Sequence, residues 1–474
     1  MKFRLFVFLI LLGGATAFAQ VPEDALRFAT PVLGIGPRAV GMGSAFLPIA
    51  DDYTALYWNP AGLGQLGRRE VSFGLSNAGY TSDASFQSLT TTSFINSLQL
   101  DNIGVVIPAR HNTAGFAFAF GYNKVNDFTS ATSFSGVNPN STLIEWQVRN
   151  TAFSPTTSIV YLAGVAGIVK GTLTTPVKSG LRQAGTVEEG GSLHALSIGG
   201  GGEIAEGLDL GASLHIYTGS YTYGRQYKET DVNGLYTAQD TANWTNIDLY
   251  QYAQNDNVDA SIGGFGATVG LLYHFADVAS MGVTIDVPSS YHITENFSTV
   301  AQSSFDNGDL SGKITENFRN EYDVTTPLTL GAGVAGHPIP LLTISGAIDY
   351  RDYTQLRFSN TSDQTLMQYN TDMRTIFRPT YNYRLGVEYK IAPLGLGVRA
   401  GYQFFESAYA ADPSGEGQKT ISGGVSMVLA KKALLEVAYA HGTMKAVHVN
   451  YDATSMTNET ISLNHFLLGF AYRF

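Results

Sequence analysis

Period-two alternation of apolar residues with small or polar residues is the feature that most constrains this 474-residue chain. In "TAGFAFAFGY", residues 113–122, the aromatic side chains fall on one face and the alanines on the other. "NYRLGVEYK", residues 382–390, and the stretch that begins at Leu342 repeat the pattern with charged residues on the second face. Such alternation predicts β-strands with one apolar face and one polar or small-residue face.

These strands are expected to form one large β structure. A soluble chain of this length usually divides into two or three domains, but no linker rich in Pro or Ser is present. The chain contains 52 Gly, 27 Phe and 26 Tyr, and only 14% of its residues are charged. After residue 19 no apolar run is long enough to cross a bilayer as a helix. If the chain spans a membrane, it therefore does so as a barrel.

The spacing of the alternating segments predicts an all-β fold, an antiparallel transmembrane barrel of about 14 strands over residues 70–474. The expected strands are 70–76, 102–109, 113–125, 192–204, 208–225, 260–275, 279–297, 318–336, 342–358, 380–390, 396–407, 418–430, 434–449 and 458–474. Short and long connections alternate between them without exception. Tight periplasmic turns and long extracellular loops are typical of outer-membrane barrels.

The N-terminus predicts export. Lys2 and Arg4 precede an apolar run and the small-residue end Ala17-Phe18-Ala19, so residues 1–19 are interpreted as a cleaved signal peptide. Cleavage would change the formal net charge from −11 to about −13, which argues against nucleic acid as a partner. The chain has no Cys, which excludes disulfides and thiolate metal sites.

Residues 20–69 lack the alternation and contain "GIGPRAVGMGSAFLPIADDYTALYWNPAGLG". A motif of this kind before the first strand resembles the FadL/TodX family of outer-membrane transporters for long-chain fatty acids and other hydrophobic molecules. The residues that carry the resemblance are Gly36, Ala39, Gly41, Met42, Gly43, Ala45, Ala50, Asp51, Asp52, Trp58, Asn59, Pro60, Ala61 and Gly62.

The resemblance implies a fourteen-stranded barrel in the outer membrane of a Gram-negative cell, with residues 20–69 folded inward as a hatch. It implies passive uptake of hydrophobic small molecules and contact with outer-membrane lipid. The ligand would leave sideways through a wall opening beside a kinked third strand, here 113–125. Outer-membrane barrels also commonly end on an aromatic residue, so Phe474 resembles the signal read by the barrel-assembly machinery.

Within the hatch, we expect a latch formed by Asp51, Asp52, Trp58, Asn59, Pro60, Ala61 and Gly62. Irregular backbone at membrane depth must be satisfied inside protein, and glycines permit close approach to the wall. Asp51 and Asp52 are expected to pair with lumen-facing arginines such as Arg351, Arg384 and Arg399. A lumen network of Asp349, Arg351, Arg384, Glu388 and Arg399, with Asp286 and Glu436 as further lumen charges, is interpreted as an ion network rather than an acid/base pair.

The loop before residue 192 contains "TTSIVYLAGVAGIVKG", residues 156–171. Its apolar residues are Ile159, Val160, Leu162, Val165 and Ile168. They form either a landing site for a hydrophobic ligand or a segment packed into the barrel mouth.

No motif indicates an enzyme, a cofactor or a metal site. "GIGPRA" lacks the preceding strand of a dinucleotide-binding fold, and the histidines are dispersed. Two alternatives to uptake of hydrophobic molecules remain. One is a barrel that resembles the PorV-like components of a secretion machine and binds protein cargo, and the other is an open porin with a water-filled path past Asn59.

Overall fold

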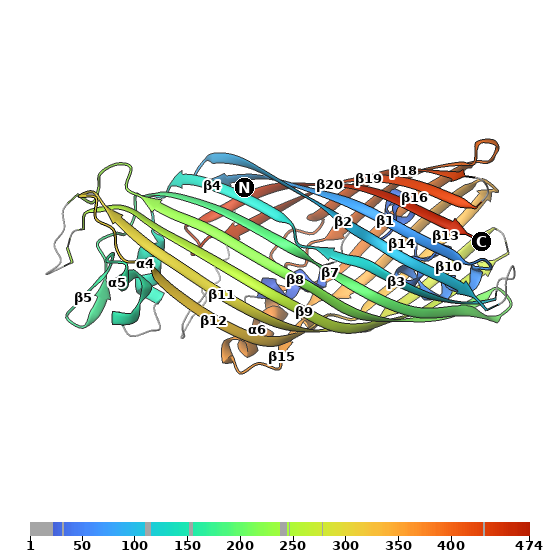
Figure 1. Cartoon of the computed structure of the whole chain (residues 1–474), viewed down its shortest axis with the longest axis horizontal. Coiled ribbons are helices and arrows are strands. Elements are labelled where there is room, and N and C mark those ends of the chain that lie inside the picture. The colour runs from blue at the N-terminus through green and yellow to red at the C-terminus, as the bar shows by residue number, and fades with distance from the viewer. Residues whose placement is uncertain are drawn as a thin grey trace.

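The computed structural model describes residues 22–30, 33–109, 115–150, 155–237, 244–245, 247–276, 278–429 and 432–474. The predicted signal peptide, residues 1–19, lies outside this part. The strands form a closed antiparallel barrel of 14 strands, because β1 (Glu70–Phe86) pairs with β2 (Leu89–Pro108) on one side and β20 (Met456–Arg473) on the other. Figure 1 shows the strands running along the long axis of the barrel. The predicted fold class is confirmed.

The remaining strands that build the wall follow one another around the barrel. They are β3 (Phe116–Asp127), β4 (Ser130–Val137), β7 (Arg182–Ala205), β8 (Leu208–Thr230), β9 (Leu249–Phe275), β10 (Ala279–Asp286), β11 (Ser290–Phe305), β12 (Ile314–Thr325), β13 (Thr329–Ile339), β14 (Leu342–Asp352), β16 (Pro379–Ile391), β17 (Leu396–Glu406), β18 (Gly417–Leu429) and β19 (Ala433–Val449).

Three barrel strands are each interrupted and so carry two labels. β10 and β11 are separated at Pro288, and β12 and β13 at Pro327. Proline cannot donate a ladder hydrogen bond, which explains both breaks. The breaks lie side by side, since the amide of Thr326 donates to the carbonyl of Ser289 at 2.9 Å. The third interruption separates β3 from β4.

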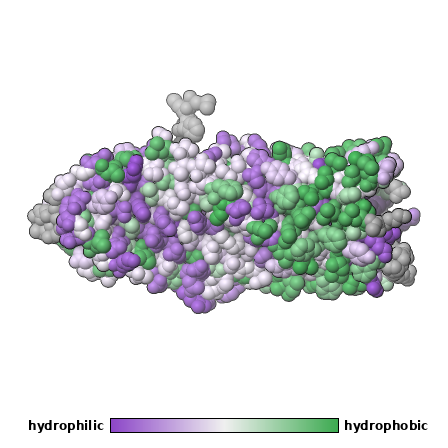
Figure 2. Space-filling view, turned by 45° about the horizontal axis from the view of Figure 1, so that its top comes forward, coloured by the Kyte–Doolittle hydropathy of each residue, from purple (hydrophilic) through white to green (hydrophobic). Residues whose placement is uncertain are grey.

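The two ends of the barrel differ. Short turns such as Glu206–Gly207 and Pro340–Leu341 join strands at one end, where the C-terminus also lies. Figure 2 shows hydrophobic residues gathered around that end and a hydrophilic surface over the other part. β9 has 27 residues, whereas about 9–11 suffice to cross a bilayer. The wall therefore continues well beyond its apolar band.

Because the wall continues beyond the apolar band, several strands are longer than the sequence predicted. Residues 77–101, expected to be the first long loop, belong to β1 and β2, which are joined by the two-residue turn Gln87–Ser88. Short and long connections thus do not alternate without exception. The alternation was missed because in water neither face of a strand such as "LTTTSFINSLQL" (89–100) needs to be uniformly apolar.

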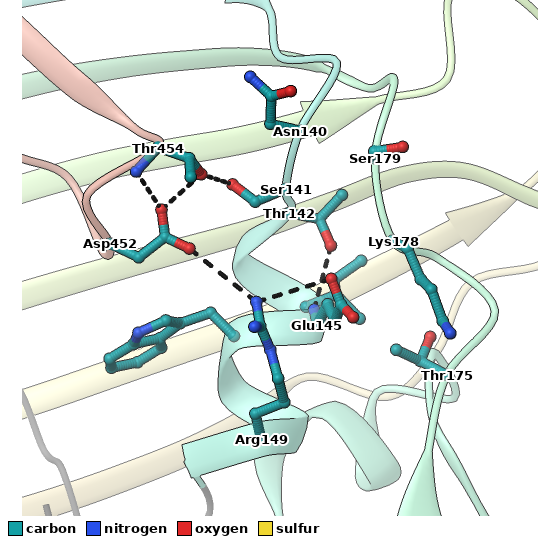
Figure 3. Close-up of polar contacts among 12 residues, drawn as sticks. Asn140, Ser141, Thr142, Glu145, Arg149, Thr175, Lys178, Ser179, Asp452 and Thr454 are labelled. Carbon is teal, nitrogen blue, oxygen red and sulfur yellow. Dashed lines mark hydrogen bonds and ion pairs between the residues drawn. The ribbon is translucent and has the colours of Figure 1, made fainter. Parts of the chain in front are cut away.

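Loops at the far end pack on a hydrophobic core of their own, here called the outer cap. Its core joins residues of β1, β8, β9 and β11 to α4 (Leu143–Asn150), α5 (Ile159–Leu162) and the small hairpin of β5 (Gly167–Val169) and β6 (Thr172–Thr174). Figure 3 shows polar contacts that tie α4 to the β19–β20 connection. Arg149 lies 3.6 Å from Glu145 and 4.0 Å from Asp452.

Residues 33–66, here called the N-terminal segment, lie between opposite parts of the wall. Its helix α2 (Pro37–Gly41) contacts β17 to β20, while the 3₁₀ turn η1 (Pro60–Gln65) contacts β3, β7, β8 and β9. A Cβ atom at Gly401 of β17 would lie 1.9 Å from the amide nitrogen of Gly43, so only glycine permits this approach. The short helices α1 (Pro22–Ala29) and α3 (Ala55–Trp58) flank these contacts. Among the described residues, no helix is long and apolar enough to cross a membrane.

One long connection joins β14 to β16, which are paired directly in the wall. It contains the turn η3 (Tyr353–Gln355), β15 (Arg357–Ser359) and α6 (Gln364–Ile376), which lie on the flank of the barrel (Figure 1). The short turn η4 (Ala392–Leu394) joins β16 to β17, and η2 (Pro155–Thr157) precedes α5.

Candidate functional site

Asn59 joins the N-terminal segment to the wall. Its side-chain amide donates to the carbonyl of Leu47 at 3.2 Å and to the carbonyl of Leu271 on β9 at 3.1 Å. Its carbonyl oxygen accepts the amide of Ala61 at 3.1 Å and so caps η1. Asn59 is fully buried. One side chain therefore holds two parts of the segment and one wall strand together.

The two adjacent acids have other partners than the sequence suggested. Asp51 forms an ion pair with Arg38 of the same N-terminal segment, and Arg38 in turn makes two hydrogen bonds with Glu388 on β16. Asp52 accepts from the amide and the hydroxyl of Thr54 at 2.8 and 2.5 Å. The expected pairing with wall arginines is thus wrong, because an arginine inside the segment lies closer to Asp51.

The other residues of the predicted latch pack tightly. The indole nitrogen of Trp58 donates to the carbonyl of Ile35 at 3.1 Å. Pro60 and Ala61 touch the glycines of the wall, since a Cβ at Gly211 would lie 2.2 Å from the Pro60 carbonyl carbon. A Cβ at Gly62 would lie 2.2 Å from the carbonyl oxygen of Ala50. The Asn-Pro-Ala-Gly turn therefore fits the wall without spare room.

The predicted lumen network divides into two groups. In the first, Arg399 bonds to Glu388 at 2.7 Å and to Glu436 at 2.9 Å, and Arg38 completes this group. In the second, Arg384 pairs with Asp349. Arg351 has no carboxylate within ion-pair distance among the described residues.

Arg351 instead binds the C-terminal end of helix α1. It donates to the carbonyl of Ala29, the last residue of α1, and to the hydroxyl of Thr329 at 3.0 Å. A cation at a helix C-terminus is favourable because unpaired carbonyls carry partial negative charge there. Arg351 therefore fixes α1 against the wall.

Next to α1 lies a hydrophobic core rich in tyrosine and phenylalanine, here called the aromatic cluster. The ring of Phe28 on α1 lies 5.8 Å from that of Phe128 and 6.3 Å from that of Tyr291. The further aromatic members are Tyr217, Tyr221, Tyr223, Tyr322, Tyr353, Phe358, Tyr369, Phe377 and Tyr409. Phe377 and the residues of α6 close this cluster on the flank of the barrel.

β8 shows how these features are stacked. Gly211 touches the N-terminal segment, Tyr217 and Tyr221 belong to the aromatic cluster, and Tyr227 belongs to the outer cap. The lumen thus contains three layers from the short-turn end outward. A small molecule that crosses the barrel must pass or displace each layer.

The hydrogen-bonded wall has a break between β2 and the third barrel strand. The β2–β3 ladder ends at the pair Asn102 and Asn123, and a bulge follows between Lys124 and Asn126. Beyond it, residues 89–101 of β2 pair only with β1, and β4 pairs only with β7, among the described strands. The resemblance led us to expect an irregular third strand at this place.

A small cavity of about 20 Å³ lies on the inner side of this break. Leu33 and Val40 of the N-terminal segment line it together with Asp101, Lys124 and His465 of the wall. Its volume suits one or two waters. Because residues of both parts line this cavity, the edge of the N-terminal segment lies next to the break.

The apolar loop residues lie in the outer cap. Ile159, Val160 and Val165 are buried in its core, Ile168 is half-buried, and Leu162 is 48% exposed. This placement agrees with the alternative of a segment packed into the barrel mouth. Only Leu162 offers much apolar surface.

Together these features define a class of protein. A closed antiparallel barrel with short turns at one end, an outward apolar band and a filled lumen is an outer-membrane β-barrel. No group of three or more metal-ligating side chains occurs in the described part of the chain.

Several solved barrels have a similar fold. The toluene transporter TodX of P. putida is 12% identical, with a TM-score of 0.58 over 93% of this chain and 99% of that chain. A Pseudomonas aeruginosa FadL homologue is 11% identical, with a TM-score of 0.59 over 94% and 99%. The Ralstonia pickettii toluene transporter TbuX is 15% identical, with a TM-score of 0.53 over 93% and 99%. No protein-family model matches the sequence, and no curated protein does.

Sequence reasoning missed several residues of the site. Arg38 lies in the N-terminal motif, and the available signal was its charge thirteen residues before Asp51. The aromatic cluster was missed because its rings come from strands far apart in the sequence.

Proposed function

We propose that this protein is a passive outer-membrane channel for the uptake of hydrophobic small molecules. The observation that carries the proposal is the stacking of an aromatic cluster on an N-terminal segment that touches both sides of the barrel. TodX and TbuX, which share the fold, are toluene transporters. Burial of aromatic and aliphatic surface would provide affinity at roughly 25 cal/mol per Å².

In this proposal the N-terminal segment is the hatch. Asn59 and the Arg38 ion pairs hold it closed, and movement of the segment opens a path toward the break between β2 and β3. The ligand leaves into the lipid phase at the inner end of this break, beside the pair Asn102 and Asn123, where the apolar band ends. The aromatic cluster is occupied by Phe28, so a ligand displaces part of α1 when it binds.

The structure offers no specific support for the two alternatives. Capture of protein cargo would use wide polar outer loops, whereas the loops here pack on a shared apolar core. An open porin would need water to pass Asn59, which is fully buried and bonded on both sides.

Locking the hatch tests the proposal. A Cβ at Gly386 of β16 would lie 2.9 Å from the Cβ of Met42 but only 2.3 Å from the carbonyl oxygen of Met42, so a disulfide between cysteines at these positions requires the N-terminal segment to move away from β16 by about 1 Å or more. The chain has no other cysteine. We expect proteoliposomes with oxidised Met42→Cys/Gly386→Cys protein to lose uptake of a hydrophobic tracer.

The same protein after reduction is the matched control, and we expect it to regain uptake. Each single-cysteine variant should be insensitive to oxidant. Equal uptake by the oxidised and reduced double variant, with the disulfide verified, would contradict a hatch that moves at this point.

A further inference from the structure

One strand of the wall has an edge without a partner among the described strands. Residues 89–100 of β2, here called the free edge, pair with β1 on one side only. Figure 1 shows the β1–β2 hairpin reaching well beyond β3, which pairs with β2 only at residues 102–108. An unpaired edge presents backbone donors and acceptors to any extended chain, so natural proteins usually cover or block it.

The hairpin geometry shows which backbone groups are unpaired. Gln87 and Ser88 both have positive φ, 47° and 66°, as the two central residues of a type I′ turn do. The pair Phe86 and Leu89 that closes such a turn is hydrogen-bonded, and hydrogen-bonded pairs then alternate along the two strands. The even-numbered residues from 90 to 100 therefore direct their backbone groups away from β1. Each of them offers one N–H and one C=O group to a further strand.

The free edge lacks the usual protection against pairing. Its sequence LTTTSFINSLQL contains no charged residue and no proline, and its register with β1 is unbroken. The even-numbered side chains point outward, and among them Phe94 and Leu98 are 65% and 71% exposed. The exposed polar residues Thr92 and Asn96 alternate with these two, so the surface does not continue the apolar band. The free edge thus combines an open backbone ladder with two apolar anchor points.

The nearest strand of the chain itself is held away from the free edge. β4 lies against the lumen side of β1, where the ring of Phe134 lies 5.1 Å from that of the buried Phe86. The hydroxyls of Thr132 on β4 and Ser82 on β1 both donate to Glu459 on β20, at 2.8 and 2.7 Å. β4 pairs with β7 and is fixed in place by these contacts. It therefore does not supply the missing strand.

A second copy of the protein in the same membrane cannot supply this strand either. Antiparallel pairing of two identical strands requires a twofold axis perpendicular to both, which would place one barrel upside down relative to the other. Copies inserted in the same direction are related by an axis along the membrane normal. Because barrel strands tilt by about 35–45° from that normal, their two free edges would cross at about 70–90°. Neither arrangement forms a ladder along residues 89–100.

We propose that the free edge binds an extended, uncharged segment of another protein, which adds a strand to the wall outside the membrane. A polypeptide in extended conformation matches the alternating N–H and C=O groups of a strand edge. Pairing along the whole edge makes about twelve main-chain hydrogen bonds, which is close to the number in a typical stable interface.

The side chains of the free edge define the chemistry of the partner. Apolar residues of the partner opposite Phe94 and Leu98 add cross-strand contacts. A charged residue at the centre of the pairing would meet no opposite charge on the free edge, which favours an uncharged segment. This inference goes beyond hydrophobic uptake. It concerns the side wall rather than the outer loops, and the partner does not pass through the barrel.

A peptide that copies residues 89–100, with two glutamates at each end and a fluorescent label, is the probe. A free peptide can pair in either direction, unlike a second copy held in the membrane. The glutamates keep the peptide soluble, and the acidic chain repels them, so general electrostatic attraction does not contribute to binding. We expect saturable binding in fluorescence anisotropy titrations of the purified protein in detergent. The same peptide with backbone N-methyl groups on both edges should not bind, because it lacks the donors.

Two substitutions of one residue separate backbone pairing from side-chain effects. Asn96 is exposed and directs its N–H away from β1, so Asn96→Pro removes a donor and blocks the ladder at that point. The bonds to β1 are made by the neighbouring residues Ile95 and Ser97 and remain. We expect Asn96→Pro to weaken peptide binding at least about tenfold, and Asn96→Ala, the matched control, to change it less than about twofold. Thr92→Pro should repeat the effect of Asn96→Pro, and heat-dependent gel mobility verifies that each variant folds.

Several outcomes would overturn the inference. Two of them are the absence of saturable binding and equal binding by the wild type and both folded proline variants. The free edge lies beyond the apolar band, so the peptide should bind protein in proteoliposomes with the same affinity as in detergent. Binding that is lost in proteoliposomes would mean that lipid covers the edge, and disulfide-linked dimers of Leu98→Cys protein there would mean that a second copy covers it. Either result would rule out a docking edge for another protein.

Discussion

At the scale of single residues, Asn59 has the most partners at the junction of segment and wall. Asn59→Ala removes the hydrogen bonds to Leu47, Leu271 and Ala61, which should weaken the closed arrangement by about 2 kcal/mol. We expect more frequent open events in planar-bilayer conductance recordings. Gln65→Ala is the control, because Gln65 bonds only within the segment, to Ile49 and Gly62. Identical recordings from both variants would exclude a latch role for Asn59.

We expect Asp52 to make the closed arrangement of this region depend on pH. Burial, and then the nearby charge of Glu70, raise the pKa of Asp52 from 3.8 to about 7. Because the folded-state pKa is the higher one, the folded state holds its proton between these values. The proton bound to Asp52 therefore stabilises the folded state. This stabilisation is complete below pH 4 and is lost as the pH rises through 7. We expect conductance to increase from pH 6 to pH 8 and Asp52→Asn to abolish the change. A wild-type channel that closes over this range would contradict the assignment.

The residues of the motif were easier to predict from sequence than their partners. "ADDYTALYWNPAGLG" indicated a tightly fixed turn, and the structure places Asn59 and Pro60 in such a turn. The partner of Asp51 was not predictable, because the choice between Arg38 and a wall arginine depends on how the segment crosses the lumen.

At the scale of elements, α5 tests the two interpretations of the apolar loop. Val160 is fully buried in the outer cap, whereas Leu162 is 48% exposed. Val160→Ala should cost about 1–3 kcal/mol of cap stability and speed proteolysis of the outer loops, since it leaves a cavity. Leu162→Ala should leave proteolysis unchanged. If Leu162→Ala instead lowers uptake of a hydrophobic tracer at constant stability, Leu162 belongs to a landing site.

Strand number followed from the sequence, but strand length did not. Within the apolar band one face must be apolar, so alternation marks segments such as 380–390 almost to the residue. Beyond the band both faces of β1 and β2 tolerate polar residues, and residues 77–101 therefore resembled a loop. The interruptions at Pro288 and Pro327 could not be located as strand ends, because the alternation resumes after each.

At the scale of the whole molecule, the apolar band sets the depth of the barrel in the membrane. Membrane crossing requires the band at the short-turn end to match the hydrocarbon layer of about 30 Å. The polar part of the wall, the outer cap and the free edge of β2 then project outward. This orientation places the aromatic cluster between the membrane and the outer cap, where a molecule that arrives from outside meets it before it meets the N-terminal segment.

Labelling of single cysteines on intact cells tests this orientation, because the chain contains no cysteine of its own. Leu214 and Thr222 both face outward on β8, but Leu214 belongs to the apolar band and Thr222 lies eight residues farther from the short turn at Gly207. We expect a membrane-impermeant maleimide to label Thr222→Cys and not Leu214→Cys. Both variants should react after the protein is extracted in detergent, which controls for assembly and thiol reactivity. Labelling of Leu214→Cys alone on intact cells would mean that the band has been assigned to the wrong end, and the proposed path from aromatic cluster to hatch would have to be reversed.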